Sequence, residues 1–292
     1  MKTENGIALL LIIAAVFLLI SHLSTNNLEF SRYNAGWNGT SDFFDLQNRH
    51  TTEDITNTSS LSGKQNSTLL IIAPKKPYSA YELSDYRSYI QRGNIIILAD
   101  DFGTGNDFLR GIGSSIRILP GIVASVDRAY NDSYAIVSYP VFNHSLTRNV
   151  SSIVLDKGAA LEGGEPLIKT TLMSWIDADN NARITKKEML GKYTVVTREH
   201  IGKGELIVLS DPSIFINTMN SLDDKWDNRK FIENILALSN HLIIDQANSR
   251  TSDTDGYSTI MQDLKSSSLS MLAFIGLLLF ILIILFIKKR YI

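Results

Sequence analysis

The residues best suited to chemistry lie in one Asp-rich segment, 177–188, with the sequence DADNNARITKKE. A twelve-residue calcium loop takes its oxygen ligands from positions 1, 3, 5, 7, 9 and 12. In this segment those positions are held by Asp177, Asp179, Asn181, the Arg183 carbonyl, Thr185 and Glu188. The spacing therefore predicts a structural calcium ion rather than a catalytic metal.

Three features of this segment depart from an ordinary calcium loop. Ala182 stands where such loops carry glycine, and an alanine with positive φ costs on the order of 1 kcal/mol. Lys186 and Lys187 dilute the local negative charge. The preceding residues, 172–176, are typical of a strand, so a helix-loop-helix hand is not expected. The alternative is a polar turn that holds no ion.

Carboxylates also follow two of the most apolar strand candidates. Asp101 comes shortly after NIIILA at 94–99, and Asp211 follows ELIVLS at 205–210. Open α/β sheets bind ligands at the carboxyl ends of their strands, so two carboxylates there are candidates for hydrolysis or metal binding. The interpretation that we favour is that Asp101, Thr104 and Asp211 cap the helices that begin nearby.

Other catalytic classes find little support. The chain has no cysteine, which excludes cysteine nucleophiles and cysteine zinc sites. It has no Gly-x-Ser-x-Gly elbow, and its five histidines lack metal-ligand spacing. Gly103-x-Gly105 lacks the third glycine of a dinucleotide site, so no nucleotide cofactor is expected. A net charge of −2 argues against nucleic acid as a partner.

The elements that would position these residues begin with a strand, a helix and a strand. Residues 68–73 (TLLIIA) and 94–99 are continuous apolar runs, typical of strands buried on both faces of a parallel sheet. Between them, Ser79 and Glu82 have capping-box spacing, which predicts a helix that ends near Gln91. This order predicts a βαβ unit with parallel strands.

The rest of the central region is predicted to complete one α/β domain with a mostly parallel sheet and an antiparallel insertion. Lys203-Gly204 predicts a tight turn between two antiparallel strands. Further elements are a short helix at 41–48, strands at 134–139, 152–155, 192–199 and 205–210, and an amphipathic helix at 231–242. The polar residues 245–268 are predicted to form a stalk.

Two apolar stretches, 6–23 and 269–287, bracket this domain. Each is close to the roughly 20 residues that cross a bilayer as a helix, and the basic tail 288–292 favours the cytoplasmic side. We therefore expect a cell-membrane protein with two spans, both termini in the cytoplasm and the domain outside the cell. For the first stretch the alternative is a cleaved signal peptide.

Glycosylation is a further expectation for an outward-facing domain. The Ile- and Asn-rich composition together with the sequons is typical of an archaeal surface protein, although short patterns also arise by chance. Six Asn-x-Ser/Thr sequons lie between the two stretches, at Asn38, Asn57, Asn66, Asn131, Asn143 and Asn149.

Four segments resemble a prokaryotic family, the domain-of-unknown-function family 4350, over residues 28–243. They are 33–41 (YNAGWNGTS), 83–101, 204–217 (GELIVLSDPSIFIN) and 227–231 (DNRKF). The resemblance implies the flavodoxin-like fold of class I glutamine amidotransferases. It does not imply their activity, which requires a cysteine. It also implies an accessory role beside membrane systems that contain a MoxR-type AAA ATPase and transglutaminase-like proteins.

The same resemblance implies a loop that binds a ligand or partner, or that simply closes turns. Asn217 and Asn228 have side-chain amides suited to a glycan, a partner or a turn. A sugar on Asn38 would conflict with a buried role for that residue. The residues of this loop are Asp101, Asp211, Ser213, Asn217, Asn228, Asn34 and Asn38.

Three functions remain in competition on the sequence. The leading one is a non-enzymatic, membrane-anchored accessory, sensor or assembly subunit that binds a partner or surface glycan. The second is a hydrolase of surface polysaccharide or peptide that uses Asp101 and Asp211, which must then lie within about 10 Å of each other in an open cleft. The third is an envelope protein stabilised by calcium.

Overall fold

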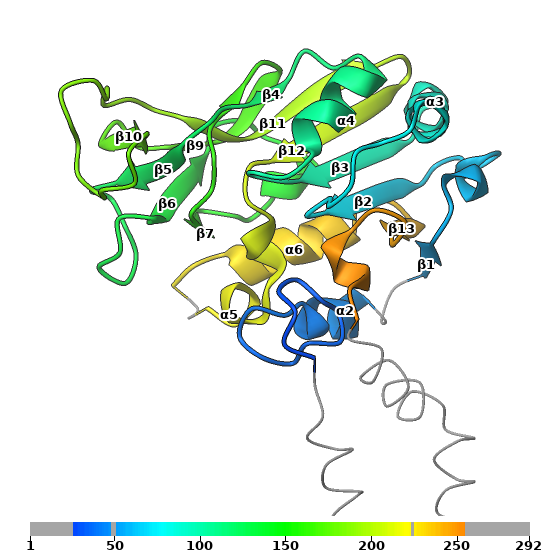
Figure 1. Ribbon diagram of the computed structural model, residues 1–292, viewed down its shortest axis with the longest axis horizontal. Coiled ribbons are helices and arrows are strands. Elements are labelled where there is room, and N and C mark those ends of the chain that lie inside the picture. Colours follow the sequence, from blue (N-terminus) through cyan, green and yellow to red (C-terminus); the bar gives the residue numbers. More distant parts are fainter. Residues whose placement is uncertain (1–25, 48–50, 223–224, 255–292) are drawn as a thin grey trace, which may run out of the picture. The chain divides into compact units, whose positions relative to one another are not determined.

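The computed structural model describes residues 26–47, 51–222 and 225–254, and residues Leu28–Asp253 form one folded unit. Within it, eleven strands form a mixed sheet with the main order β1-β13-β2-β3-β12-β11-β9-β6-β7, and β5 and β10 form a separate pair (Figure 1). The strands are β1 (Thr52–Ile55), β2 (Thr68–Ile72), β3 (Ile95–Ala99), β4 (Arg117–Ile118), β5 (Ile122–Ser125), β6 (Ala135–Pro140), β7 (Ile153–Asp156), β8 (Leu161–Glu162), β9 (Glu165–Thr170), β10 (Ser174–Asp177), β11 (Thr194–Ile201), β12 (Gly204–Leu209) and β13 (Leu242–Asp245). The helices are α2 (Ser41–Gln47), α3 (Ala80–Gln91), α4 (Gly105–Ile112), α5 (Asn217–Asn220) and α6 (Asn228–Leu236), with short 3-10 turns η1 (Thr58–Leu61), η2 (Ser145–Thr147), η3 (Pro212–Phe215) and η4 (Arg250–Ser252).

The sheet has a parallel side and an antiparallel side that meet at β12. Strands β1, β13, β2, β3 and β12 pair in parallel. From β12 onward, β11, β9, β6 and β7 pair antiparallel. The predicted α/β class is therefore confirmed, and the antiparallel strands extend the parallel sheet along one side.

The predicted βαβ unit is present. Strands β2 and β3 pair in parallel, with Thr68 opposite Ile95. Helix α3 begins with a capping box in which the Ser79 hydroxyl accepts the Glu82 N–H at 3.3 Å. The Glu82 carboxylate accepts the Ser79 N–H at 2.8 Å in return, so two amide donors that the helix leaves free are both satisfied.

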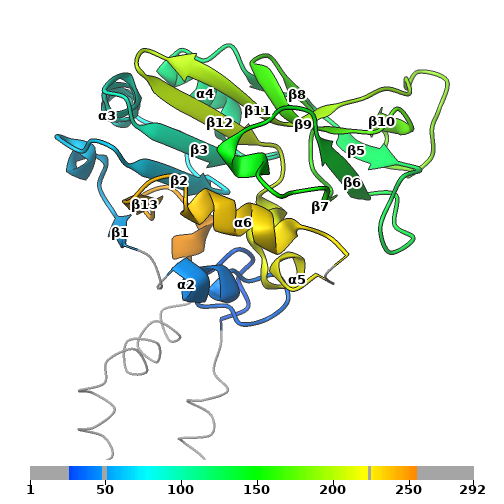
Figure 2. The same cartoon turned by 180° about the vertical axis from the view of Figure 1, so that it is seen from behind.

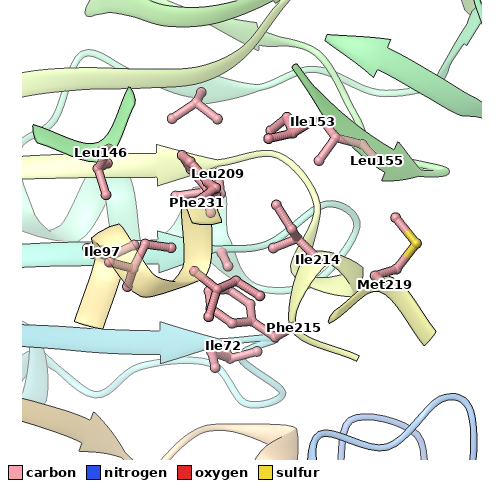
Figure 3. Packing of buried hydrophobic residues seen from close by; sticks show 14 of the residues in the cluster. Ile72, Ile97, Leu146, Ile153, Leu155, Leu209, Ile214, Phe215, Met219 and Phe231 are labelled. Atoms are coloured by element: carbon pink, nitrogen blue, oxygen red, sulfur yellow. The ribbon is translucent and has the colours of Figure 1, made fainter. Parts of the chain in front are cut away.

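Alternation of side chains along the parallel strands divides the core between the two faces of the sheet. On β2, Leu69 and Ile71 belong to the cluster that includes the apolar residues of α3 and α4. Leu70 and Ile72 belong to the cluster formed with α2, η3 and α6. Figures 1 and 2 show these two sets of helices on opposite faces, and Figure 3 shows Ile72 beside Phe215.

Two predicted boundaries at the end of the domain are wrong. The helix expected at 231–242 ends at Leu236, and Leu242–Asp245 form β13, which lies between β1 and β2. The predicted stalk does not begin at Asp245, because that side chain is fully buried and accepts hydrogen bonds from the Ala247 and Asn248 N–H groups. The folded unit continues to Asp253. Strand β1 was also missed in the polar N-terminal segment.

The two ends of the folded unit lie side by side. The Arg32 N–H donates to the Thr251 carbonyl at 3.0 Å, and the Ser31 hydroxyl donates to the Asp253 carbonyl at 2.6 Å. The predicted spans 6–23 and 269–287, the tail 288–292 and the stalk beyond residue 254 lie outside the described residues. Within the described ranges, no helix combines the length and apolarity needed to cross a bilayer.

Candidate functional site

Buried carboxylates gather where the parallel strands end. Asp100 follows β3, Asp211 comes just after β12, and Asp245 ends β13; none is more than 2% exposed. Asp100 accepts the N–H groups of Gly103 at 3.2 Å and Gly105 at 2.7 Å. A Cβ at Gly105 would lie 2.6 Å from the Asp100 carboxylate, so this glycine allows the backbone to approach the carboxylate rather than forming a nucleotide site.

Burial dominates the electrostatics of this edge. It raises the pKa of Asp100 to about 7 and the pKa of Asp211 to about 8, although the amide donors act in the opposite direction. The negative charge of Asp101 adds to both increases. Burial also raises the pKa of Asp101 itself. A raised pKa can mark a catalytic acid, but the carboxyl groups of Asp100 and Asp211 are buried within the fold.

The predicted capping residues have different outcomes. Asp211 caps η3, as expected, because its carboxylate accepts the Ser213 N–H at 2.7 Å. Asp101 does not cap α4, since its carboxylate accepts the N–H of the adjacent Phe102. Thr104 stands at the N-cap position without a side-chain hydrogen bond. The Asp100 carboxylate instead accepts the N–H groups of Gly103 and Gly105 at the start of this helix.

Asp211, Asp227 and Asn228 meet along the free edge of β7. The Asp211 carboxylate accepts the Asp156 N–H at 2.7 Å. The Asn228 side chain accepts the Val154 N–H and donates to the Val154 carbonyl, both at 2.8 Å. A free sheet edge invites pairing with another strand. These side chains therefore occupy backbone groups that would otherwise be available to another chain.

Asp227 extends this cover to the residues just before the strand. Its carboxylate accepts the Ser151 N–H at 2.7 Å, and its own N–H donates to the Ser152 carbonyl at 3.0 Å. We call Asp211, Asp227 and Asn228 the edge seal. Its side chains and the Asp227 N–H bind Ser151, Ser152, Val154 and Asp156, in or just before β7, so they fix the loop after β12 and the start of α6 against this strand.

Asn217 and Asn34 fasten the N-terminal segment to the domain. The Asn217 side chain donates to the Gly36 carbonyl at 2.7 Å and accepts the Asp42 N–H at 3.0 Å, at the start of α2. The Asn34 side chain donates to the Asn38 side-chain oxygen at 3.0 Å. The residues of the sequence-predicted ligand loop are thus divided between two sets of contacts, in which Asn34, Asn217 and Asn228 bind groups within the fold.

The hydrolase hypothesis needs Asp101 and Asp211 in an open cleft. Asp211 has no exposed surface, and both of its carboxylate oxygens accept backbone N–H groups. Asp211 therefore cannot reach a polysaccharide or peptide in this conformation. The geometric condition of the hypothesis is not met.

The Asp-rich segment follows β10 and brings three carboxylates together. The carboxylate oxygens of Asp177, Asp179 and Glu188 lie within 4.8 Å of one another. Two oxygens bound to one calcium ion at 2.3–2.6 Å can lie no farther apart than about 5 Å, so this spacing fits a shared ion. The side chain of Asn181 accepts the Arg183 N–H at 2.7 Å, and Glu188 accepts the Thr185 N–H at 2.8 Å.

The backbone of this segment is strained at two residues that are not glycine. Ala182 has a φ of 58° and Asn180 a φ of 57°. The Asp177 carboxylate accepts the Ala182 N–H and the Tyr134 hydroxyl, both at 2.7 Å. Burial would raise the pKa of Asp177, but these donors hold it below its ordinary value. Desolvation and the charges of its two acidic neighbours raise the pKa of Asp179.

The sequon asparagines differ in access. Asn38 is partly buried and its side-chain oxygen accepts from Asn34, so a sugar on its Nδ2 would have to fit beside that contact. The other five have exposed positions: Asn57, Asn66, Asn131, Asn143 and Asn149.

The comparison that decides the family is a match of residues 32–236 to the family model described as "Domain of unknown function (DUF4350)". The chain belongs to the DUF4350 family. The match includes the edge seal and Asn34 and Asn217, whose side chains fasten the N-terminal segment. These polar residues, which carried the sequence resemblance, therefore hold the fold together. No curated protein matches the chain.

Solved structures resemble the domain only distantly. The mmIFT52 N-terminal domain has a TM-score of 0.48 and 18% identity, over 66% of this chain and 88% of that one. The cytoplasmic protein STM1381 from Salmonella typhimurium LT2 has a TM-score of 0.40 and 10% identity, over 68% and 86%. A putative ThuA-like protein from Bacteroides uniformis ATCC 8492 has a TM-score of 0.32 and 12% identity, over 69% and 73%. These scores carry no functional argument.

Sequence reasoning missed the edge seal. Asn228 and Val154 are 74 residues apart, and no local pattern joins an asparagine at the start of a helix to a distant edge strand. The sequence feature that came nearest was the set of polar residues beside apolar segments, Asp211, Asn217, Asp227 and Asn228. It indicated that these residues lie near one edge of the sheet, but not that they bind β7.

Proposed function

We propose that this chain is a membrane-anchored accessory or assembly subunit whose outward domain binds a partner or a surface glycan and performs no catalysis of its own. One observation carries the proposal: the polar residues at the ends of β3 and β12 and at the start of α6 are occupied by contacts within the fold. Asp100, Asp211 and Asn228 bind backbone groups and have almost no exposed surface. The flavodoxin-like, amidotransferase-like character of the sheet is part of the same proposal.

The position of the two domain ends supports the anchoring. Ser31 and Arg32 contact Thr251 and Asp253, so the chain enters and leaves the folded unit at adjacent points. Two spans that start from one place can insert in the same bilayer without stretching the domain. Membrane localisation, the outward orientation and an association with a MoxR-type ATPase system follow from this proposal.

Copurification from native membranes tests the proposal. The tagged full-length protein is crosslinked in membranes, purified and analysed by mass spectrometry, with an unrelated two-span protein carrying the same tag as the control. We expect a reproducible set of membrane proteins that the control lacks. Recovery of the protein alone, or turnover of a polysaccharide or peptide that is lost in Asp101→Asn, would overturn it.

Calcium-dependent stability is the second candidate function, and the spacing of Asp177, Asp179 and Glu188 favours it. These carboxylates would hold the ion, with further oxygens from Asn181, the Arg183 carbonyl and Thr185. The ion would neutralise their mutual repulsion and fix the loop that follows β10. It would supply no chemistry beyond this charge neutralisation.

A further inference from the structure

An exposed groove lies at the antiparallel end of the sheet. Its volume is about 580 Å³. The groove is formed by the end of β6, the end of β9, the turn into β10 and Lys192, which lies between the Asp-rich segment and β11. The side chains that define it are Tyr139, Val141, Lys169, Leu172, Met173 and Lys192.

The groove gathers large apolar side chains that the fold does not cover. Leu172 is 63% exposed, Val141 50% and Met173 47%. Val126, which is also exposed, adjoins them because its N–H donates to the Met173 carbonyl at 3.0 Å. Single exposed apolar residues need no explanation, but a contiguous group marks an interaction surface. Methionine suits such a surface because its side chain adapts to varied partners.

The sheet places two lysines beside these apolar side chains. Tyr139 of β6 lies opposite Lys169 of β9, so both lie on the same face. A bridge between Ser174 and Gly191 brings the end of the Asp-rich loop back to the start of β10. Lys192 therefore reaches the same groove as Met173.

The groove is basic as well as apolar. Neither Lys169 nor Lys192 forms an ion pair with a described residue, and no residue that lines the groove is acidic. Asp127 lies at its rim, where its carboxylate accepts the Tyr139 hydroxyl at 3.1 Å. The complementary ligand has apolar side chains that enter the groove and carboxylates that meet the lysines.

We propose that this groove docks an extended acidic and apolar peptide segment of a partner protein. The inference rests on the proposed accessory function and names the partner's chemistry.

A lipid surface has similar chemistry, but the position of the groove favours a peptide. Strand β9 lies five strand spacings from β13, or about 24 Å at about 4.8 Å per strand. Asp253 follows shortly after β13, and Figure 2 shows β6 and β10 at the opposite side from β13.

Fluorescence anisotropy tests the docking directly. The full-length protein in detergent is titrated into fluorescein-labelled peptides of about ten residues that mix leucine and valine with glutamate, as grooves for extended peptides require. Matched peptides carry lysine in place of glutamate, or serine in place of the apolar residues. We expect binding by the acidic and apolar peptides, and at least tenfold weaker binding by both matched sets.

Variants locate the binding. The pair Lys169→Glu with Lys192→Glu, and the pair Leu172→Ser with Met173→Ser, should each weaken binding at least tenfold. The controls Lys203→Glu and Tyr81→Ser, at exposed positions elsewhere, should change it less than twofold. Circular dichroism verifies that each variant is folded.

Three outcomes would overturn the docking proposal. They are no binding by any acidic and apolar peptide, equal binding by the groove variants, and loss of cosedimentation with phosphatidylserine vesicles in those variants without any peptide binding. Failure of the anchored-subunit proposal looks different, because peptide binding to the groove would persist while membrane copurification recovered no partner.

Discussion

Asn228 binds both backbone groups of Val154, accepting its N–H and donating to its carbonyl at 2.8 Å each. This is the pairing that a neighbouring strand would make. Because Val154 is on the edge strand β7, one side chain replaces a strand at this position. Its role in the fold explains why an asparagine is needed there without any ligand.

Replacing Asn228 with alanine should destabilise the domain. The change leaves two buried backbone groups of β7 without partners, which costs about 1–3 kcal/mol. Urea unfolding should show a lower midpoint, and the uncovered edge should increase self-association. The control Asn240→Ala, at an exposed position, should leave the midpoint unchanged. An unaltered midpoint in Asn228→Ala would remove the structural role.

The raised carboxyl pKa values predict that stability falls as pH rises. In the unfolded chain Asp100 and Asp211 titrate near 3.8, whereas in the fold they titrate at about 7 and about 8. Their contribution is therefore complete below about pH 4 and is lost as the pH rises through 7 and 8, at up to about 1.4 kcal/mol per pH unit for each group. Burial raises the pKa of Asp245 in the same direction.

Urea unfolding at a series of pH values measures this loss. Asp100→Asn removes one of the titrating groups, so its stability should depend less steeply on pH between 4 and 7 even if the variant is less stable overall. A free energy of unfolding that increased steadily from pH 4 to pH 8 would contradict the assignment.

Calcium should raise the melting temperature of the protein. At a calcium concentration about 100 times the dissociation constant, binding contributes about 2.7 kcal/mol. Asp179→Asn and Glu188→Gln should abolish the calcium-dependent shift, whereas Glu162→Gln, exposed and outside the loop, should retain it. Identical melts of the wild type with calcium and with a chelator would show that the three carboxylates form a turn without an ion.

Ala182→Gly should stabilise the domain without calcium. The alanine has a φ of 58°, where glycine avoids a cost of about 1 kcal/mol. Ala178→Gly in the same loop is the matched control, because Ala178 does not have a positive φ. The added backbone freedom of this glycine should lower the stability of the domain slightly. Equal effects of the two glycines on the unfolding free energy would exclude relief of strain at Ala182.

Local patterns predicted the parts of the fold that local interactions determine. The capping box of Ser79 and Glu82 gave the start of α3, and the apolar run before Asp100 gave β3. Strand β13 was missed because Leu242–Asp245 follows α6 closely and its apolar residues continue the helical pattern. Its pairing with β1 and β2 depends on residues far away in the sequence.

The candidate site also depends on contacts that local sequence patterns do not predict. The sequence placed Asp101, Asp211 and the asparagines near one edge, but it did not distinguish the buried Asp100 from its neighbour Asp101. That distinction depends on which side chain the strand turns toward the amides of the next helix. The residues of the Asp-rich segment lie close together in the sequence, and calcium binding by them stays a prediction.

Hydrogen exchange at Val154 and Asp156 in the full-length protein measures the protection that the edge seal gives to β7. Their N–H groups are bound by side chains of the edge seal rather than by a strand. We expect both amides to exchange as slowly as those that pair β7 with β6, and we expect Asn228→Ala to accelerate exchange at Val154. Rapid exchange at both amides in the wild type would contradict this expectation and would leave Asp211 and Asn228 free to bind a ligand.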